Sequence, residues 1–211
     1  MILESKITYA KNEEEAVEEI IFENETINNI DCSKINFKSI HFINCKFVDC
    51  NFNDSYFVES TFESCDFSGS KLTRVFMKNS KITNCKALGN NFVEAKFKQL
   101  VIETCFFRYA NFNSTSWENC KISGSNLQEV FMSEAKFKKM EFSKVNLSKA
   151  DFLRTLLKNV DLSDCMIYGI SLSDTCTVLK GAKISITQTE QITRLLGIKD
   201  IEHRSRIYKE F

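Results

Sequence analysis

Apolar residues recur along this chain at every fifth position. Counting in steps of five from Phe22 to Leu172 gives thirty-one positions, and all of them are apolar although only 43% of the chain is. Fifteen of the nineteen phenylalanines fall in this column. A period of five matches neither the 3.6-residue period of a helix nor the two-residue period of a strand. The pattern therefore predicts a chain that turns a corner in every pentad.

A second inward column precedes the first by two residues and consists mostly of small side chains. It runs from Ile40 to Cys165 and includes Cys45, Cys50, Ser55, Ser60, Cys65, Ser70, Val75, Ser80, Cys85, Ala95, Cys105, Ala110, Thr115 and Cys120. The other three positions of each pentad are mainly Asn, Lys, Ser, Asp and Glu. Asn and Ser suit corners because they bond to nearby backbone and tolerate turn dihedrals.

Individual pentads resemble the A(D/N)LXX motif of pentapeptide-repeat proteins. Examples are Cys65-Asp-Phe-Ser-Gly, Ala110-Asn-Phe-Asn-Ser, Ser125-Asn-Leu-Gln-Glu and Ala150-Asp-Phe-Leu-Arg. The resemblance implies an all-β fold, a right-handed quadrilateral β-helix with four pentads per coil, over residues 20–184. We expect about eight coils without interrupting loops, hence a rod of roughly 37 Å at the spacing between strands.

The two ends of the rod require caps, because each coil bonds to the backbone of its neighbours. Residues 1–19 are the expected N-terminal cap, either as a short helix starting at Asn12-Glu-Glu-Glu15 or as an extended strand. Near Cys176 the five-residue frame breaks, and it resumes two residues later at Thr177 and Leu179. Residues 185–211 are expected to form a helix and tail. The helix would start at a capping box, Thr187-Gln-Thr-Glu190, and stop at Gly197.

The C-terminal ending is similar to that of Qnr-type quinolone-resistance proteins. The matching residues are Lys180-Gly-Ala-Lys-Ile and Leu195-Leu-Gly-Ile. The resemblance implies a homodimer in which the helix seals the coil and joins two rods end to end, with an interface of Ile192, Leu195, Leu196 and Ile198. Residues 199–211 either pack on the partner subunit or are disordered.

Four cysteines, Cys45, Cys65, Cys85 and Cys105, are twenty residues apart, which is one coil. They are expected to stack as an interior ladder of small buried side chains. Metal binding is the alternative, but stacked thiols point the same way rather than converging on an ion. Nine cysteines without a secretion signal indicate reduced thiols in a cytoplasmic protein.

The pattern leaves little for chemistry. The chain has two histidines, and no Cys–His pairing, phosphate loop or carboxylate cluster emerges from the repeat. We therefore expect no catalytic residue, no metal, no cofactor, no small-molecule substrate and no membrane contact. The formal net charge of zero disfavours direct nucleic-acid binding.

Sorting the outward residues by coil separates charge between faces. The face around the core positions Phe37, Phe57, Phe97, Trp117 and Phe137 is rich in lysine: Lys78, Lys96, Lys98, Lys136 and Lys138. A neighbouring face is acidic: Glu23, Glu63, Glu103, Glu141 and Asp161. The alternative is that surface charges of a solenoid drift freely. Several aromatic residues also point outward and can mark a binding surface: Tyr56, Phe76, Phe106, Tyr109, Phe131 and Tyr168.

Two functions follow as hypotheses. The resemblance to Qnr-type and mycobacterial fluoroquinolone-resistance proteins implies a rod that imitates DNA and binds DNA gyrase or topoisomerase IV. The neutral charge departs from those acidic relatives, and the loopless frame is closer to the mycobacterial protein. The alternative is a structural scaffold that binds another protein through the basic face. Nucleic-acid binding by the lysines is a third, weaker hypothesis.

Overall fold

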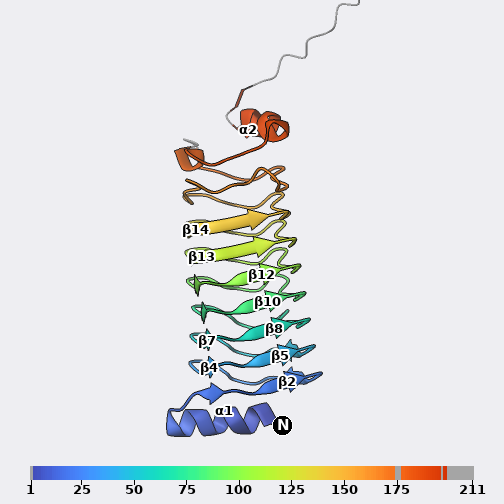
Figure 1. The fold of residues 1–211 in the computed structure, drawn as a ribbon, viewed down its shortest axis with the longest axis vertical. Coiled ribbons are helices and arrows are strands. Elements are labelled where there is room, and N and C mark those ends of the chain that lie inside the picture. Colours follow the sequence, from blue (N-terminus) through green and yellow to red (C-terminus); the bar gives the residue numbers. More distant parts are fainter. Residues whose placement is uncertain (1, 174–176, 196, 199–211) are drawn as a thin grey trace, which may run out of the picture.

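The five-residue repeat folds into flat coils of twenty residues that stack into a column (Figure 1). The computed structural model describes residues 2–173, 177–195 and 197–198. Each residue pairs in parallel with the residue twenty positions further on, as Phe22 does with Phe42 and Phe42 with Phe62. This register confirms the all-β solenoid, and it runs without an inserted loop from β1 to Ser171.

Four flat faces surround the column, and we number them in chain order. Face 1 contains β1 (Val17–Glu18), β4 (Asn36–Lys38), β7 (Tyr56–Val58), β9 (Phe76–Lys78), β11 (Lys96–Lys98) and the first halves of β13 (Ser116–Ser123) and β14 (Lys136–Ser143). Face 2 contains β2 (Ile21–Glu23), β5 (His41–Ile43), β8 (Thr61–Glu63), β10 (Lys81–Thr83), β12 (Val101–Glu103) and the second halves of β13 and β14.

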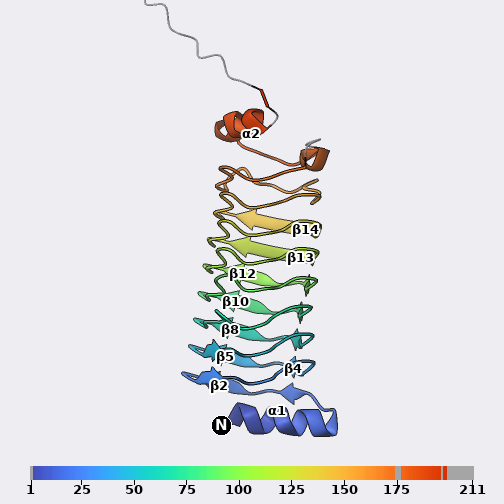
Figure 2. The same cartoon turned by 180° about the vertical axis from the view of Figure 1, so that it is seen from behind.

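The other two faces are mostly irregular. Among the described residues, face 3 has only the strands β3 (Thr26–Asn28) and β6 (Lys46–Val48), and then continues as isolated bridges. Face 4 consists of isolated bridges, from Asp31↔Asn51 to Asp151↔Ser171. Apart from β3 and β6, the strands of the described chain therefore lie on two adjacent sides of the rod (Figures 1 and 2).

The strand-built part of the rod is shorter than expected. On face 1 the strands from β1 to β14 are separated by six steps of twenty residues, so they make about six turns rather than eight. Beyond Ser143 the described part of the repeat continues through bridges and turns, without strands. A periodic apolar column predicts that the chain coils, but it does not determine whether each side of a coil forms a strand.

The corners of the coil place residues in the left-handed region. Asn24, Asn44 and Asn79 have φ of 58°, 51° and 51°, and Gly69 has 85°. These residues follow the large inward residue of each pentad by two positions. The abundance of Asn in the polar positions fits this geometry, because Asn tolerates the left-handed conformation better than most residues.

Aromatic rings fill the interior of the column in stacks. The ring centroids of Phe37 and Phe57 are 4.7 Å apart, and those of Phe97 and Trp117 are 4.2 Å apart. All described residues of the large column are buried except Phe137 and Leu172, which are half-buried. Phe137 is thus a partial exception to the predicted core: its ring packs edge-on against Phe142 at 5.9 Å and remains partly exposed.

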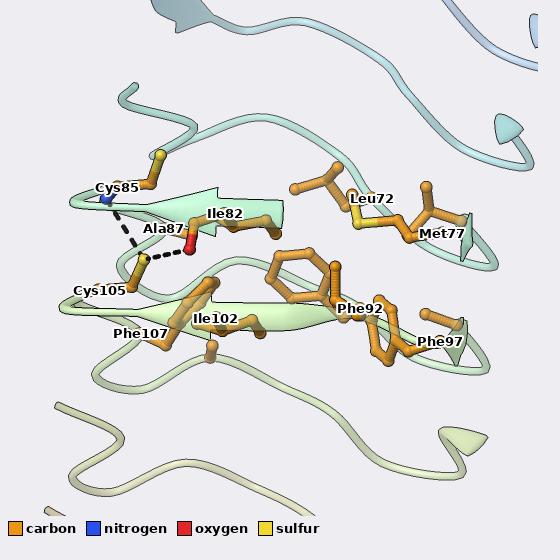
Figure 3. Close-up of a cluster of buried hydrophobic side chains, with 14 of the residues drawn as sticks. Leu72, Met77, Ile82, Cys85, Ala87, Phe92, Phe97, Ile102, Cys105 and Phe107 are labelled. Atoms are coloured by element: carbon orange, nitrogen blue, oxygen red, sulfur yellow. Dashed lines mark hydrogen bonds between the residues drawn. The ribbon is translucent and has the colours of Figure 1, made fainter. Parts of the chain in front are cut away.

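The small column has a hydrogen-bonding role as well as a steric one. The Cys45 thiol donates to the Phe22 carbonyl at 3.3 Å, and the Cys105 thiol to the Ile82 carbonyl at 3.5 Å (Figure 3). The hydroxyl of Ser55 donates to the Cys32 carbonyl at 2.6 Å. Each acceptor lies 23 residues earlier, at the large position of the preceding coil. Cys and Ser are therefore both small enough for the corner and able to satisfy a buried carbonyl.

The N-terminal end is covered by a helix that the sequence pattern did not reveal. Helix α1 (Ile2–Glu13) lies across the first coil and buries Leu3, Ile7 and Ala10 against it (Figure 1). The segment that follows is extended, because Val17 already occupies an inward position and pairs with Phe37. The repeat therefore starts before residue 20. Of the two alternatives for this segment, the extended strand is confirmed and the helix starting at Asn12 is wrong.

The C-terminal end closes with two short 3₁₀ turns and a helix. These are η1 (Thr177–Leu179), η2 (Ile186–Gln188) and α2 (Thr189–Leu195). Asp161 pairs with Lys183, a step of 22 residues, so the predicted two-residue break of the frame is confirmed.

Gln188 supplies hydrogen bonds to the end of the column that a further coil would otherwise supply. Its side-chain amide donates to the carbonyls of Leu162 and Cys165 at 2.8 and 2.7 Å. Its Oε1 accepts a hydrogen bond from the Ser185 backbone N–H at 2.8 Å. The capping contact therefore involves Ser185 and Gln188 rather than Thr187 and Glu190. Gly197, with φ of 73°, follows the helix as expected.

Candidate binding surfaces

The cysteine side chains of the interior are shielded from solvent in the described part of the chain. The eight described cysteines are free thiols and buried. In the ladder, the backbone N–H of Cys65 donates to the Cys85 sulfur at 3.3 Å, and that of Cys85 to the Cys105 sulfur at 3.3 Å (Figure 3).

Burial keeps some of the interior thiols protonated. It raises the pKa of Cys165 to about 11, and it also raises the pKa of Cys32, which lies in the large column. Within the ladder, hydrogen bonding with the neighbouring thiols of Cys45 and Cys85 lowers the pKa of Cys65 instead, but the Cys65 side chain is buried. Within residues 2–173, 177–195 and 197–198, no group of three or more His, Cys, Asp or Glu side chains converges as a metal site. None of the helices in this part of the chain could cross a membrane.

The acidic residues singled out from the sequence lie together on face 2. Glu23, Glu63 and Glu103 end strands β2, β8 and β12, so they share one column, two coils apart or about 10 Å. Glu23 and Glu63 are exposed, while Glu103 pairs with Lys81 at 2.7 Å. The other two acidic residues lie nearer the C-terminal end of the same face: Glu141 in β14 and Asp161 at the bridge to Lys183.

Face 1 contains the lysines that were grouped together from the sequence. Lys98 and Lys138 both contact the Glu118 carboxylate, at 3.7 and 2.6 Å. The hydrogen bond from Lys138 lowers the pKa of Glu118. Lys78, Lys96 and Lys136 form no ion pair with any other described residue. Face 1 (hereafter the basic face) therefore keeps an excess of positive charge.

A groove runs along the corner that leads from face 4 to face 1, and sequence reasoning missed it. Its volume is about 660 Å³, and it is lined by Asp54, Tyr56, Arg74, Phe76, Glu94, Lys96, Ser114, Ser116 and Lys136. One wall consists of corner residues, and the other of the first residues of strands β7, β9, β11, β13 and β14. The outward-pointing Tyr56 and Phe76 indicated a binding surface in the sequence. However, sorting residues into columns does not show which columns border a groove.

The C-terminal residues expected at a dimer interface divide into two groups. Ile192 and Leu195 are half-buried because they pack against the end of the core. Ile198 is 55% exposed, and Ile186, which sequence reasoning did not select, is 89% exposed. Leu196 lies outside the described residues, as does the tail 199–211. A small pocket of about 340 Å³ lies between α2 and the last coil, beside Tyr168 and Arg194.

Comparison with known proteins identifies the repeat. A family model described as a pentapeptide repeat region matches residues 55–132, and a model of pentapeptide repeats in eight copies matches residues 35–74 and 141–176. No curated protein matches the chain by sequence comparison.

Among solved structures, a trypsin-treated variant of QnrB1, a plasmid-mediated fluoroquinolone resistance protein, has a TM-score of 0.56 at 23% identity. That match covers 89% of this chain and 100% of the other. HetL, a pentapeptide repeat protein involved in heterocyst differentiation regulation in the cyanobacterium Nostoc sp. strain PCC 7120, has a TM-score of 0.33 at 10% identity, with coverages of 84% and 92%.

Proposed function

Because the chain belongs to the pentapeptide-repeat family, we propose that it is a non-enzymatic binding protein whose acidic face imitates DNA. Its target in this proposal is the DNA-binding groove of DNA gyrase or topoisomerase IV, and its effect is quinolone resistance. The acidic face is defined by Glu23, Glu63, Glu103, Glu141 and Asp161 on face 2.

The observation that carries this proposal is the fixed spacing of carboxylates on a stiff ladder. Glu23, Glu63 and Glu103 occupy equivalent positions of strands that are joined by parallel pairing throughout. Their backbone positions therefore do not need to be ordered when a partner binds, which lowers the entropic cost of association. A regular row of negative charge complements a basic groove that normally holds phosphates.

The similarity to QnrB1, itself a plasmid-mediated fluoroquinolone resistance protein, supports the fold that this proposal requires. This chain has no inserted loop from β1 to Ser171, so protection by it would depend on the faces and ends of the rod. The eight described cysteines are buried, and the described residues contain no metal-binding group, which fits a binding role.

We expect the purified protein to restore gyrase supercoiling in the presence of ciprofloxacin. Replacing Glu23, Glu63 and Glu103 together by glutamine should abolish the rescue, because the row loses its charge without a change in shape. The matched control replaces three lysines of the basic face, Lys78, Lys96 and Lys136, by glutamine and should retain rescue. Absence of rescue by the unmodified protein, together with unchanged drug susceptibility of cells, would refute the proposal for that gyrase.

The proposal includes an end-to-end homodimer through the C-terminal cap. Ile186 and Ile198 are the most exposed isoleucines of the described cap, so we expect Ile186→Asp with Ile198→Asp to give a monomer in light scattering. Ile21→Asp is the control, because Ile21 is 64% exposed at the opposite end of the rod and should leave the dimer intact. A dimer that persists in the double variant would contradict this interface.

A further inference from the structure

We propose that the groove at the corner between faces 4 and 1 binds single-stranded nucleic acid. In this arrangement Tyr56 and Phe76 stack against bases, and Lys96 and Lys136 contact phosphates further along the groove. The proposal goes beyond the topoisomerase hypothesis, which concerns the acidic face. It rests on three features of the groove: its ring pair, its unneutralised lysines and its continuity along the rod.

The ring pair is unusual for a solvent-facing column. Tyr56 and Phe76 begin strands β7 and β9. They occupy the same position in two adjacent coils, and their ring centroids are 5.8 Å apart. Tyr56 is 51% exposed and Phe76 is half-buried. No third aromatic ring covers them in the described chain. Exposed aromatic faces beside positive charge are the elements with which proteins bind unpaired bases, because every base offers a face for stacking.

The lysines of the groove continue the same column. Lys96 begins β11 and Lys136 begins β14, both are exposed, and neither forms an ion pair with a described residue. They stand two coils apart, or about 10 Å. Lys78 adds a further unpaired charge on the basic face. Phosphates can therefore approach without first displacing an internal carboxylate from these ammonium groups.

One of the two carboxylates that line the groove is already neutralised by a neighbouring side chain. Arg74 holds Asp54 through two hydrogen bonds, Nε to Oδ1 at 2.6 Å and Nη2 to Oδ2 at 2.8 Å, and this contact lowers the pKa of Asp54. Glu118 lies between Lys98 and Lys138. Glu94 is the lining carboxylate that has no ion pair among the described residues, so it opposes a polyanion. Its removal should strengthen binding.

A single strand fits these features better than a duplex or an acidic protein. The bases of a duplex are already stacked, so the ring pair would have nothing to receive. An acidic protein segment would use the lysines but would gain little from two aromatic faces. The net charge of zero disfavours general polyanion binding, whereas the groove places Lys96 and Lys136 in line with the two rings.

The test measures fluorescence anisotropy of a labelled twelve-nucleotide oligodeoxythymidylate over a range of KCl concentrations. With about three phosphate contacts, the logarithm of the association constant should fall with the logarithm of salt with a slope of about −2. Tyr56→Ala with Phe76→Ala should weaken binding roughly tenfold or more. Lys96→Gln with Lys136→Gln should reduce the slope by about 1.4. Glu94→Gln should tighten binding.

Matched controls use the other faces of the same rod. Phe106→Ala with Tyr109→Ala removes two exposed aromatics of face 3, and Lys121→Gln removes a lysine of face 2; both should bind the oligonucleotide as the unmodified protein does. Circular dichroism verifies that every variant keeps its fold. These variants leave the acidic row unchanged, so failure of gyrase protection and failure of oligonucleotide binding are separate results.

Three outcomes would overturn the inference. One is that the oligonucleotide does not bind at about 50 mM KCl, a low salt concentration at which phosphate contacts are strong. Another is equal competition by duplex DNA, which would make the ring pair irrelevant. The third is equal displacement by polyglutamate together with no effect of the aromatic substitutions, which would assign the groove to an acidic protein partner.

Discussion

Replacing Phe57 by alanine should lower the free energy of unfolding by about 3–5 kcal/mol. Phe57 is fully buried, and its ring stacks on Phe37 at 4.7 Å and meets Phe62 edge-on at 5.2 Å. Alanine would remove these contacts and leave a cavity that the paired backbones on either side cannot close. Urea denaturation followed by circular dichroism measures the loss.

Phe137 supplies the matched control for this substitution. It occupies the same column and the same face as Phe57, so the repeat alone treats the two as equivalent. In the structure it is only half-buried, and we expect Phe137→Ala to cost about 0.75–1.5 kcal/mol, half of the roughly 1.5–3 kcal/mol gained when such a side chain is completely buried. Equal losses for the two variants, or an unchanged melting temperature for Phe57→Ala, would show that the stacked core is described wrongly.

Replacing Ile40 by lysine should destabilise the rod by more than about 3 kcal/mol, because the buried ammonium group would have no partner. Ile40 is in the small column with no exposed surface, and its backbone N–H donates to the Ser60 hydroxyl at 3.3 Å, which fixes the backbone at this corner. Thermal melts followed by circular dichroism should show an early or absent transition.

The same substitution three residues later should be tolerated. Ile43 points outward on face 2, and its strand neighbours in the two adjacent coils are Glu23 and Glu63. A lysine there lies between two carboxylates, so Ile43→Lys should change stability by less than about 1 kcal/mol, as expected for exposed ion pairs. Similar melting temperatures for the two lysine variants would contradict the assignment of inward and outward positions.

The interior of the rod could be predicted almost completely from sequence because its physical cause is local. A coil of four pentads places the same two positions inward in every repeat, and the thirty-one apolar residues reveal this without any knowledge of distant contacts. The assignment of Cys45, Cys65, Cys85 and Cys105 to a buried ladder followed from the same twenty-residue spacing. The two-residue break before Leu179 could also be read from the frame, since it shifts every later inward position by two.

The ends required information that the repeat does not contain. Helix α1 was not predicted from the sequence, because its buried residues have to match the first coil, whose shape is known only after folding. Capping by Gln188 could not be foreseen for the same reason. Its amide donates hydrogen bonds to the carbonyls of Leu162 and Cys165, which would otherwise be left without a partner at the end of the column.

Sequence by itself determined the register, the identity of the core and the distribution of charge over four faces, because all three follow from counting along a periodic chain. Tertiary structure decided how much of the coil forms strands, how deeply Phe137 is buried and which columns border the groove of Tyr56, Phe76, Lys96 and Lys136. These depend on how side chains from different coils share space at a corner, and a repeat pattern contains no measure of that space.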